Sequence, residues 1–393
     1  MYKSNRRLID ILIVVFISTF VGILAGASYI YSENNKIKND NVKISEINEI
    51  DKMYNTILSN YYGEIDKKKL AEAAIAGMLS ILDKNTTYMD PVSTNNFNKK
   101  ITGEYYGIGV EVLGVEEGLL VVSVIKDSPA SDSGIKENDI IKELNGELLD
   151  YQSASSFTNI VENSTEELKL KINRNGRDLN ISVMPEKVVL QSVTSNIYKT
   201  DGKNVGYIKI SIFAMNTATQ FANKLKEIEN EGIDALIIDV RNNTGGYLSN
   251  AASILEMFMK KDEVLYKTKS NNSIMTRKDE TDEYRDYPVA ILVNGASASA
   301  SEVLTACFME NHNSKIIGTK TYGKGTIQET INLLDNSMAK ITTKKWLTPN
   351  ENWIDEVGIT PTIVVDLSQT YINNPIVGND NQLETALKEV IKK

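Results

Sequence analysis

The sequence predicts an α/β protein with a helix-covered sheet at its core and a separate β-rich domain before it. Two short apolar runs, residues 235–240 and 289–293, are each followed by a glycine-containing turn and a helical pattern. Strands this apolar are typical of sheets buried on both faces by helices. Residues 103–186 instead show short strand-like runs separated by turn signals. At 393 residues, the chain is long enough for two or three domains.

An apolar segment near the start of the chain, residues 11–30, follows three basic residues. As a helix it is long enough to cross a bilayer core of about 30 Å. Preceding basic residues favour a cytoplasmic N-terminus. We therefore expect residues 1–31 to form a cytoplasmic stub and a single-pass signal-anchor in the cell membrane, with the rest extracytoplasmic. The alternative is a signal peptide cleaved near Ala25-Gly26-Ala27, which would give a secreted protein.

Residues 32–100 are predicted to form a linker and an N-terminal helical region. Residues 32–42 are polar and rich in Asn and Lys, as is typical of a linker. Apolar residues then recur at helical spacing from Ile44 to Leu82. The run Tyr61-Tyr62-Gly63-Glu64 interrupts that spacing, so we expect two helices.

Residues 101–186 contain three strand-like runs, a helical segment and a fourth strand-like run, and Gly107, Ile108, Gly109 and Val110 lie at the first run. This order resembles a PDZ domain, in which those four residues would occupy the carboxylate-binding loop. Glycines before an edge strand leave backbone N–H groups free to hold a terminal carboxylate while a peptide adds to the sheet. We therefore expect a PDZ domain that binds peptide tails.

The composition excludes several classes of function. A net charge of −9 argues against a nucleic-acid partner, because phosphate binding requires a basic surface. The single cysteine, Cys307, excludes an intrachain disulfide framework, and its apolar neighbours predict burial. Residues 318–324 match the spacing of a phosphate-binding loop, but Gly325 stands where Ser or Thr is needed and a strand pattern follows. We expect no metal and no organic cofactor.

Ser299 and Lys324 are the candidate catalytic pair. Ser299 lies at the predicted start of a helix, and a serine nucleophile needs a base. The only histidine, His312, lies in a polar loop and is expected at the surface, so a lysine with suppressed charge is the other common choice. Its pKa must fall from about 10.4 toward neutrality, which burial achieves if no carboxylate opposes it. Glu302, one helical turn beyond Ser299, has to point away from the lysine.

Backbone N–H groups near Ser299 can supply an oxyanion hole. The N–H of Ala300 is free at the helix start, and Gly245 or Gly246 at the other helix could give a second donor. Alternation after Lys324 places Gln328 on the same strand face, where it could hold the lysine amine. A non-catalytic interpretation also fits these residues: Ser299 would simply cap a helix, and Gly245-Gly246 would simply form a turn.

Taken together, these motifs resemble those of the C-terminal processing peptidases, also called carboxyl-terminal or tail-specific proteases. The resemblance runs from about Ile47 to the C-terminus and rests on residues 239–246, 297–302 and 321–328. It implies that residues 187–393 form a crotonase-like peptidase core and C-terminal tail. It also implies the following roles: Ser299 as nucleophile, Lys324 as base, Gln328 as its orienting partner, and Ala300 and Gly245 as oxyanion donors.

The resemblance further implies endoproteolysis near the C-termini of extracytoplasmic or membrane proteins, with the PDZ domain docking the tail and gating the site. It implies a homodimer formed through the N-terminal helices. The chain departs from the family pattern at Asp83-Lys84-Asn85-Thr86 and at Thr360-Pro361-Thr362, away from the catalytic pair. Two other functions stay open at this point: a non-catalytic, membrane-tethered PDZ scaffold, and acyl-CoA chemistry on a crotonase-like core.

Overall fold

The computed structural model describes residues 45–392. The predicted membrane segment, residues 11–30, lies outside this range. None of the helices within the described range is both long and apolar enough to cross a bilayer. The chain divides into two compact units after Ile75.

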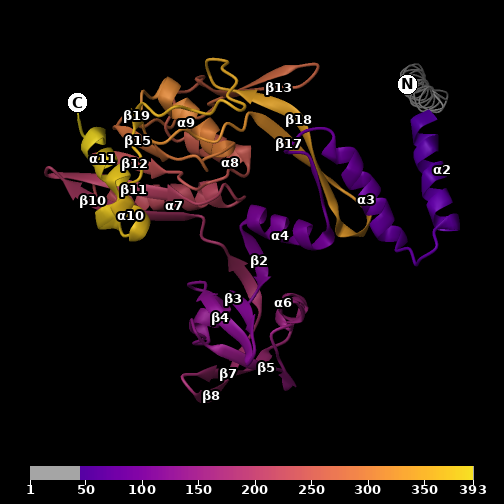
Figure 1. Ribbon diagram of the computed structural model, residues 1–393. Helices are drawn as coiled ribbons and strands as arrows, with labels where there is room; N and C mark the ends of the chain where they lie inside the picture. The colour runs from indigo at the N-terminus through magenta and orange to yellow at the C-terminus, as the bar shows by residue number, and fades with distance from the viewer. Residues whose placement is uncertain (1–44, 393) are drawn as a thin grey trace, which may run out of the picture. The chain divides into compact units, whose positions relative to one another are not determined.

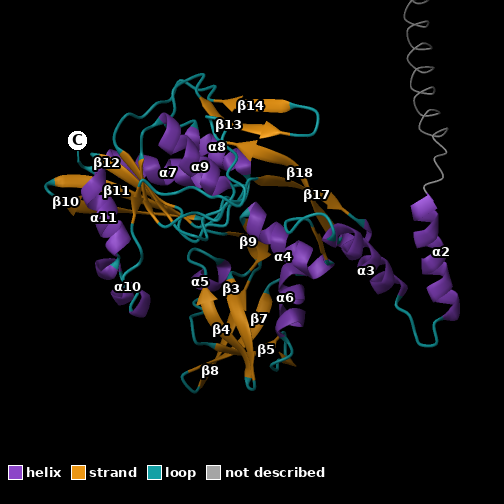
Figure 2. Ribbon diagram, turned by 45° about the horizontal axis from the view of Figure 1, so that its top comes forward, coloured by secondary structure: helices purple, strands orange, loops and turns teal. Residues whose placement is uncertain are grey.

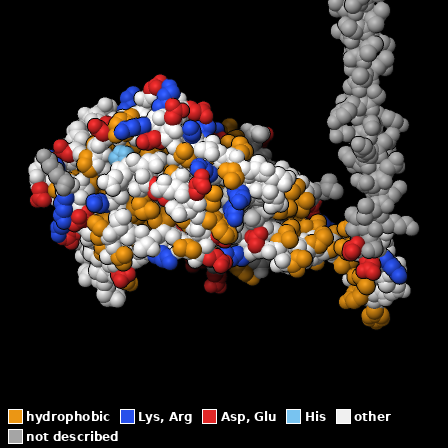
Figure 3. Space-filling model, turned by 90° about the horizontal axis from the view of Figure 1, so that it is seen from above, with side chains coloured by type: hydrophobic (Ala, Val, Ile, Leu, Met, Phe, Trp, Pro, Cys, Tyr) orange, Lys and Arg blue, Asp and Glu red, His pale blue; other side chains and the backbone are white. Residues whose placement is uncertain are grey.

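The first unit contains helix α2 (Ser45–Asn60) and the start of helix α3 (Lys67–Ser80). The two helices and the break between them confirm the prediction from the apolar spacing. The hydroxyl of Tyr54 donates a hydrogen bond to the carbonyl of Lys67 across this break, at 3.4 Å. Helix α2 exposes the large apolar side chains of Ile47, Ile50 and Met53. Apolar side chains are visible on the helical segment next to the grey residues in Figure 3.

A six-stranded sheet forms the centre of the second unit (Figure 1). The strand order is β10-β11-β12-β15-β16-β19; β10 runs antiparallel to β11, and all other neighbours are parallel. Every residue of β12 and β15 is buried, as their apolar sequences predict. The strands are β10 (Val193–Thr200), β11 (Lys203–Ile210), β12 (Ala235–Asp239), β15 (Val289–Val293), β16 (Lys315–Gly318) and β19 (Ile363–Val364).

Helices cover both faces of this sheet. In β12, Leu236 and Ile238 pack into a cluster with α7, α8 and α9, which lie side by side in Figure 2. Ala235 and Ile237 point to the opposite face, where they pack against α11. This alternation is the period of two expected of a strand buried on both sides. The helices are α7 (Thr217–Asn230), α8 (Leu248–Leu255), α9 (Ala300–Asn311), α10 (Gln369–Asn373) and α11 (Asn381–Val390).

A second sheet centres on the long strand β18 (Met338–Leu347). Strand β17 (Thr326–Asn332) pairs with β18, as do β1 (Thr87–Met89) and β13 (Val264–Lys269). Strand β14 (Ile274–Lys278) completes a hairpin with β13. The alternating sequence after Lys324 predicts β17, but the pairing of β1 with β18 is a long-range contact that no local pattern indicates.

The β-rich domain has its own apolar core, which includes Leu119, Ile141, Phe157 and Ile172. Its sheet has the order β3-β4-β5-β7-β8, with β6 on β5, so β3 is an edge strand. The predicted order of strands and helix is confirmed. The elements are β3 (Val110–Val115), β4 (Gly118–Val124), α5 (Pro129–Asp132), β5 (Ile140–Leu144), β6 (Glu147–Leu148), α6 (Ala154–Asn163), β7 (Leu168–Arg174) and β8 (Arg177–Val183).

Two chain segments join this domain to the rest of the second unit. Strand β2 (Glu104–Gly107) enters it and strand β9 (Glu186–Val189) leaves it, and the two pair antiparallel. Helix α4 (Pro91–Thr102) precedes β2, and the N–H of Met215 donates to the carbonyl of Ile101 at its end. The domain is therefore held beside the core by a short two-stranded ribbon.

Candidate active site

Ser299 precedes α9 in a backbone conformation that non-glycine residues rarely adopt. Its φ is 55° and its ψ is −116°. Such a conformation costs about 1–3 kcal/mol and is found mainly at functional sites. Gly245 touches this turn, because a Cβ on Gly245 would lie 2.9 Å from the Cβ of Ser299. The glycine is therefore required for the close approach of the two loops.

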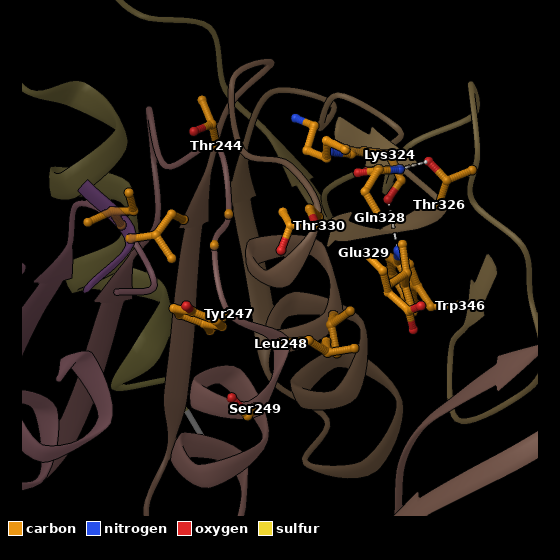
Figure 4. A pocket seen from close by; sticks show the side chains of 18 of the residues that line it. Thr244, Tyr247, Leu248, Ser249, Lys324, Thr326, Gln328, Glu329, Thr330 and Trp346 are labelled. Carbon is orange, nitrogen blue, oxygen red and sulfur yellow. Dashed lines mark hydrogen bonds between the residues drawn. The ribbon is translucent and has the colours of Figure 1, made fainter. Parts of the chain in front are cut away.

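The predicted catalytic residues lie around one pocket of about 900 Å³ (Figure 4). Ser299 lines it from the start of α9, Lys324 and Gln328 from the β17 segment, and Gly245 with Gly246 from the loop after β12. Within residues 45–392, no hydrogen bond joins Ser299 to Lys324. The fold thus brings the pair to one pocket without bonding one to the other.

The amine of Lys324 is electrostatically suited to act as a base. Burial lowers its pKa from 10.5 to about 8, and the nearby charge of Lys340 lowers the pKa in the same direction. The charges of Asp83, Glu302 and Asp355 act in the opposite sense. Lys324 forms no salt bridge with any described residue. A substantial fraction of this amine is therefore neutral near pH 8.

Glu302 is completely buried beside the pair, but it does not bind the lysine amine. One carboxylate oxygen accepts from the Thr321 hydroxyl (2.5 Å) and the Gly323 N–H (2.7 Å). The other accepts from the N–H groups of Ser299 (2.9 Å) and Lys324 (2.8 Å). The carboxylate therefore joins the serine turn to the lysine loop. The spacing of Ser299 and Glu302, which is that of a capping box, was the available sequence signal.

Gln328 is held by two threonine hydroxyls. Its Nε2 donates to Oγ1 of Thr326 (2.9 Å, dashed in Figure 4) and to Oγ1 of Thr342 (3.1 Å). No hydrogen bond to Lys324 is present in the described part of the chain, so its role as the orienting partner of the amine stays a prediction. The two threonines fix the amide at the wall of the pocket.

The three predicted oxyanion donors differ in availability. The N–H of Gly245 already donates to Oδ1 of Asn243, at 2.9 Å. Asn243 is completely buried and its Nδ2 donates to the carbonyl of Ile210. The N–H groups of Ala300 and Gly246 find no acceptor among residues 45–392. Gly245 can serve only if Asn243 releases its N–H, whereas the other two are free.

Arg241 fixes the start of the loop that follows β12 and contains Gly245. Its buried guanidinium binds the carboxylate of Asp239 (2.6 Å) and that of Asp380 (2.8 Å). It also donates to the side chain of Gln382, at the start of α11. The network therefore ties the loop after β12 to the C-terminal helix. Asp239 is two positions from Arg241, but Asp380 and Gln382 lie 139 and 141 positions away, so the sequence offered no local signal for the network.

The predicted carboxylate-binding loop lies between β2 and β3. Its four residues, Gly107 to Val110, are held through carbonyls: Ile108 accepts from the N–H of Ala130 and Gly109 from that of Ile125, both at 2.8 Å. Gly109 has a φ of 86° and contacts Ser128 so closely that a Cβ would not fit. Neither Ile108 nor Gly109 donates its N–H to an acceptor among residues 45–392, and Val110 begins the edge strand β3, so carboxylate binding remains a prediction.

His312 and Cys307 lie outside the pocket. His312 is half-buried, not at the surface as expected, because its ring packs against Phe308 and its Nε2 lies 3.0 Å from the carbonyl of Arg285. Cys307 is completely buried, as its neighbours predict. No group of His, Cys, Asp and Glu within the described residues could hold a metal ion.

Comparison with known proteins identifies relatives along most of the chain. The model of peptidase family S41 matches residues 204–365, the PDZ domain model residues 107–184, and the model of the activating protease CtpB N-terminal domain residues 18–93. The chain is 36% identical over 355 residues to the carboxy-terminal processing protease CtpB of Bacillus subtilis (strain 168), covering 89% of this chain and 73% of that protein. It is 33% identical over 363 residues to a "Probable CtpA-like serine protease" of Staphylococcus aureus (strain COL), covering 89% and 72%.

A solved structure shares the fold. It comes from Bacteroides fragilis NCTC 9343 and is described as an S41 protease. The TM-score is 0.52 at 17% sequence identity, and the match covers 84% of this chain and 92% of that one.

Proposed function

The chain belongs to peptidase family S41 and is a serine-type C-terminal processing peptidase with a PDZ domain, and on that premise we propose that Ser299 and Lys324 are its catalytic dyad. One observation carries the proposal. A strained serine at a helix start shares a pocket with a half-buried lysine whose pKa is lowered to about 8.

In the proposed mechanism, the neutral amine of Lys324 removes the hydroxyl proton of Ser299 as the serine oxygen attacks the scissile carbonyl. The ammonium then gives this proton to the leaving amine, and an acyl-enzyme remains. Water activated by the same amine hydrolyses the ester and restores the serine. The free N–H groups of Ala300 and Gly246 are suited to stabilise the oxyanion, and Gly245 joins them once Asn243 releases it.

Substrates are proposed to be proteins with accessible C-terminal tails. The loop Gly107-Ile108-Gly109-Val110 and the free edge of β3 suit a tail that adds to the sheet with its carboxylate at the loop. Docking of the tail in this domain would gate the site in the core.

Location and assembly are also proposed from the sequence. Residues 11–30 would anchor the protein in the cell membrane with its catalytic part outside, or be removed as a signal peptide to give a secreted form. The exposed apolar residues of α2, Ile47, Ile50 and Met53, suit a homodimer contact through the N-terminal helices. Alkaline carbonate extraction of membranes distinguishes the anchored form, which stays in the pellet, from the cleaved one.

The dyad is tested by cleavage of an unstructured protein with an apolar C-terminus. We expect Ser299→Ala and Lys324→Ala each to abolish cleavage while PDZ binding of the tail is retained. Activity in either variant would remove the dyad.

A further inference from the structure

Lys340 lines the same pocket as Ser299 and Lys324, but the chemistry proposed above does not use it. It lies in β18, paired with Thr87 of β1 on one side and Thr330 of β17 on the other. A residue in a strand paired on both edges is fixed in position. Its side chain is half-buried, and its amine lies 5.9 Å from the centre of the Phe97 ring.

The cation of Lys340 has no counter-ion in the described part of the chain. Among residues 45–392 it forms no salt bridge, and burial lowers its pKa. Lys100 of α4 lines the same pocket and also forms no salt bridge with the described residues. The pocket carboxylate of Glu329 is bound at 2.7 Å by Lys344 instead. Phe97 offers the cation of Lys340 only the face of its ring, and a partly desolvated cation without a carboxylate partner favours an anion supplied by a ligand.

The position of Lys340 relative to Lys324 indicates which part of a substrate it meets. Lys340 is near enough to lower the pKa of Lys324 by its charge. A base that takes the serine proton delivers it to the leaving amine, so the fragment that leaves lies on the lysine side of the site. In a cleavage near the end of a protein, this fragment is short and ends in an α-carboxylate.

We propose that Lys340, assisted by Lys100, forms a carboxylate-binding subsite for the leaving fragment, C-terminal to the scissile bond. This inference rests on the proposed function, because it requires hydrolysis at Ser299. The carboxylate has two possible sources with the same chemistry: the terminal α-carboxylate of the fragment, which then lies at Lys340 and no longer in the loop of the PDZ domain, or an acidic side chain within the fragment.

Three peptides of otherwise identical sequence test the subsite. The first has a short leaving fragment with a free C-terminus, the second has the same fragment amidated, and the third is amidated and carries one Glu in the fragment. The measured quantity is kcat/KM, expressed as a ratio to the amidated neutral peptide. We expect wild type to favour at least one of the charged peptides, and Lys340→Gln to lower that ratio about tenfold. The peptide whose ratio falls identifies the source of the carboxylate.

Two further variants serve as controls. Lys340→Arg keeps the cation and is expected to keep the preference. Lys345→Gln removes a charge from the same strand, where Lys345 lies over the ring of Trp353 outside the pocket, and its ratio should equal that of wild type. The ratio is insensitive to an altered pKa of Lys324, since that change affects all three peptides alike. Tail binding by the PDZ domain is likewise unaffected by Lys340.

The outcomes separate this inference from the proposed function. Cleavage of all three peptides without a charge preference in wild type would overturn the subsite and leave the peptidase intact. A preference that persists in Lys340→Gln, or disappears equally in Lys345→Gln, would also overturn it. If wild type cleaves none of the peptides, the proposed function fails and the subsite with it.

Discussion

Two buried networks, called joints below, hold the loops of the pocket by different means: one is centred on Glu302 and the other on Arg241. At one, the carboxylate of Glu302 accepts from three backbone N–H groups and one hydroxyl, and no cationic side chain of residues 45–392 binds it. At the other, the guanidinium of Arg241 is bound by two carboxylates. The difference follows from what each joint holds. A joint next to the base has to fix the lysine backbone without ion-pairing its amine, whereas the joint of the oxyanion loop has no such limit.

The largest effect is expected at the Glu302 joint. Glu302→Ala leaves four donors without their acceptor and releases the serine turn from the lysine loop. Because a misplacement of about 1 Å costs roughly 100-fold in rate, kcat should fall by about 100-fold or more. Steady-state cleavage of a tail substrate measures the loss of kcat, and urea unfolding measures the loss of stability separately.

Glu310→Ala is the matched control for this prediction. Glu310 lies on the same helix and accepts hydrogen bonds from the N–H of Asn350 and the side chain of Asn352, outside the pocket. We expect Glu310→Ala to lower the free energy of unfolding while kcat changes little. Equal losses of kcat in the two variants would remove the special role of the Glu302 joint.

The Arg241 joint should respond mainly in stability. Arg241→Met leaves the buried carboxylates of Asp239 and Asp380 unpaired, which costs about 3–5 kcal/mol of unfolding free energy. Arg277→Met removes an ion pair at a partly exposed side chain, for which about 1 kcal/mol or less is expected. Urea unfolding measures both, and a similar loss in the two variants would mean that the buried network contributes no more than a surface pair.

The two joints also show what the sequence could predict. The residues of the pocket follow from short motifs, since Ser299 stands directly before α9, Lys324 in the loop before β17, and Gly245 in the loop between β12 and α8. Glu302 was predicted only to point away from the lysine, because the hydroxyl and N–H groups that donate to its carboxylate come from a loop about 20 positions later. The partners of Arg241 and the position of Lys340 depend on tertiary pairing, which local periodicity does not encode.

The smallest effect is the pH dependence, which tests whether the Glu302 joint leaves the amine free. The neutral amine of Lys324 is the active form, so activity should be lost as pH falls below its pKa of about 8. A single group of this pKa gives a roughly tenfold rise in kcat/KM between pH 7 and pH 9.

The free energy of unfolding should also increase with pH. Because the folded-state pKa lies below the unfolded value of 10.5, the unfolded state holds more protons between about pH 8 and 10.5, and the unfolding free energy rises with pH there.

Variants at the two joints sharpen this prediction. The charge of Glu302 raises the pKa of Lys324, whereas Arg241 is not among the groups that act on it. In Glu302→Gln, the midpoint of the residual activity should therefore move below pH 8, and in Arg241→Met it should stay in place. Lys324→Met should remove the rise in unfolding free energy that Lys324 contributes, leaving the smaller rise of the same sign from Lys340, whose pKa burial also lowers. A midpoint near 10 in wild type would mean that the amine is solvated or ion-paired in the working enzyme, and that the joint does not protect it.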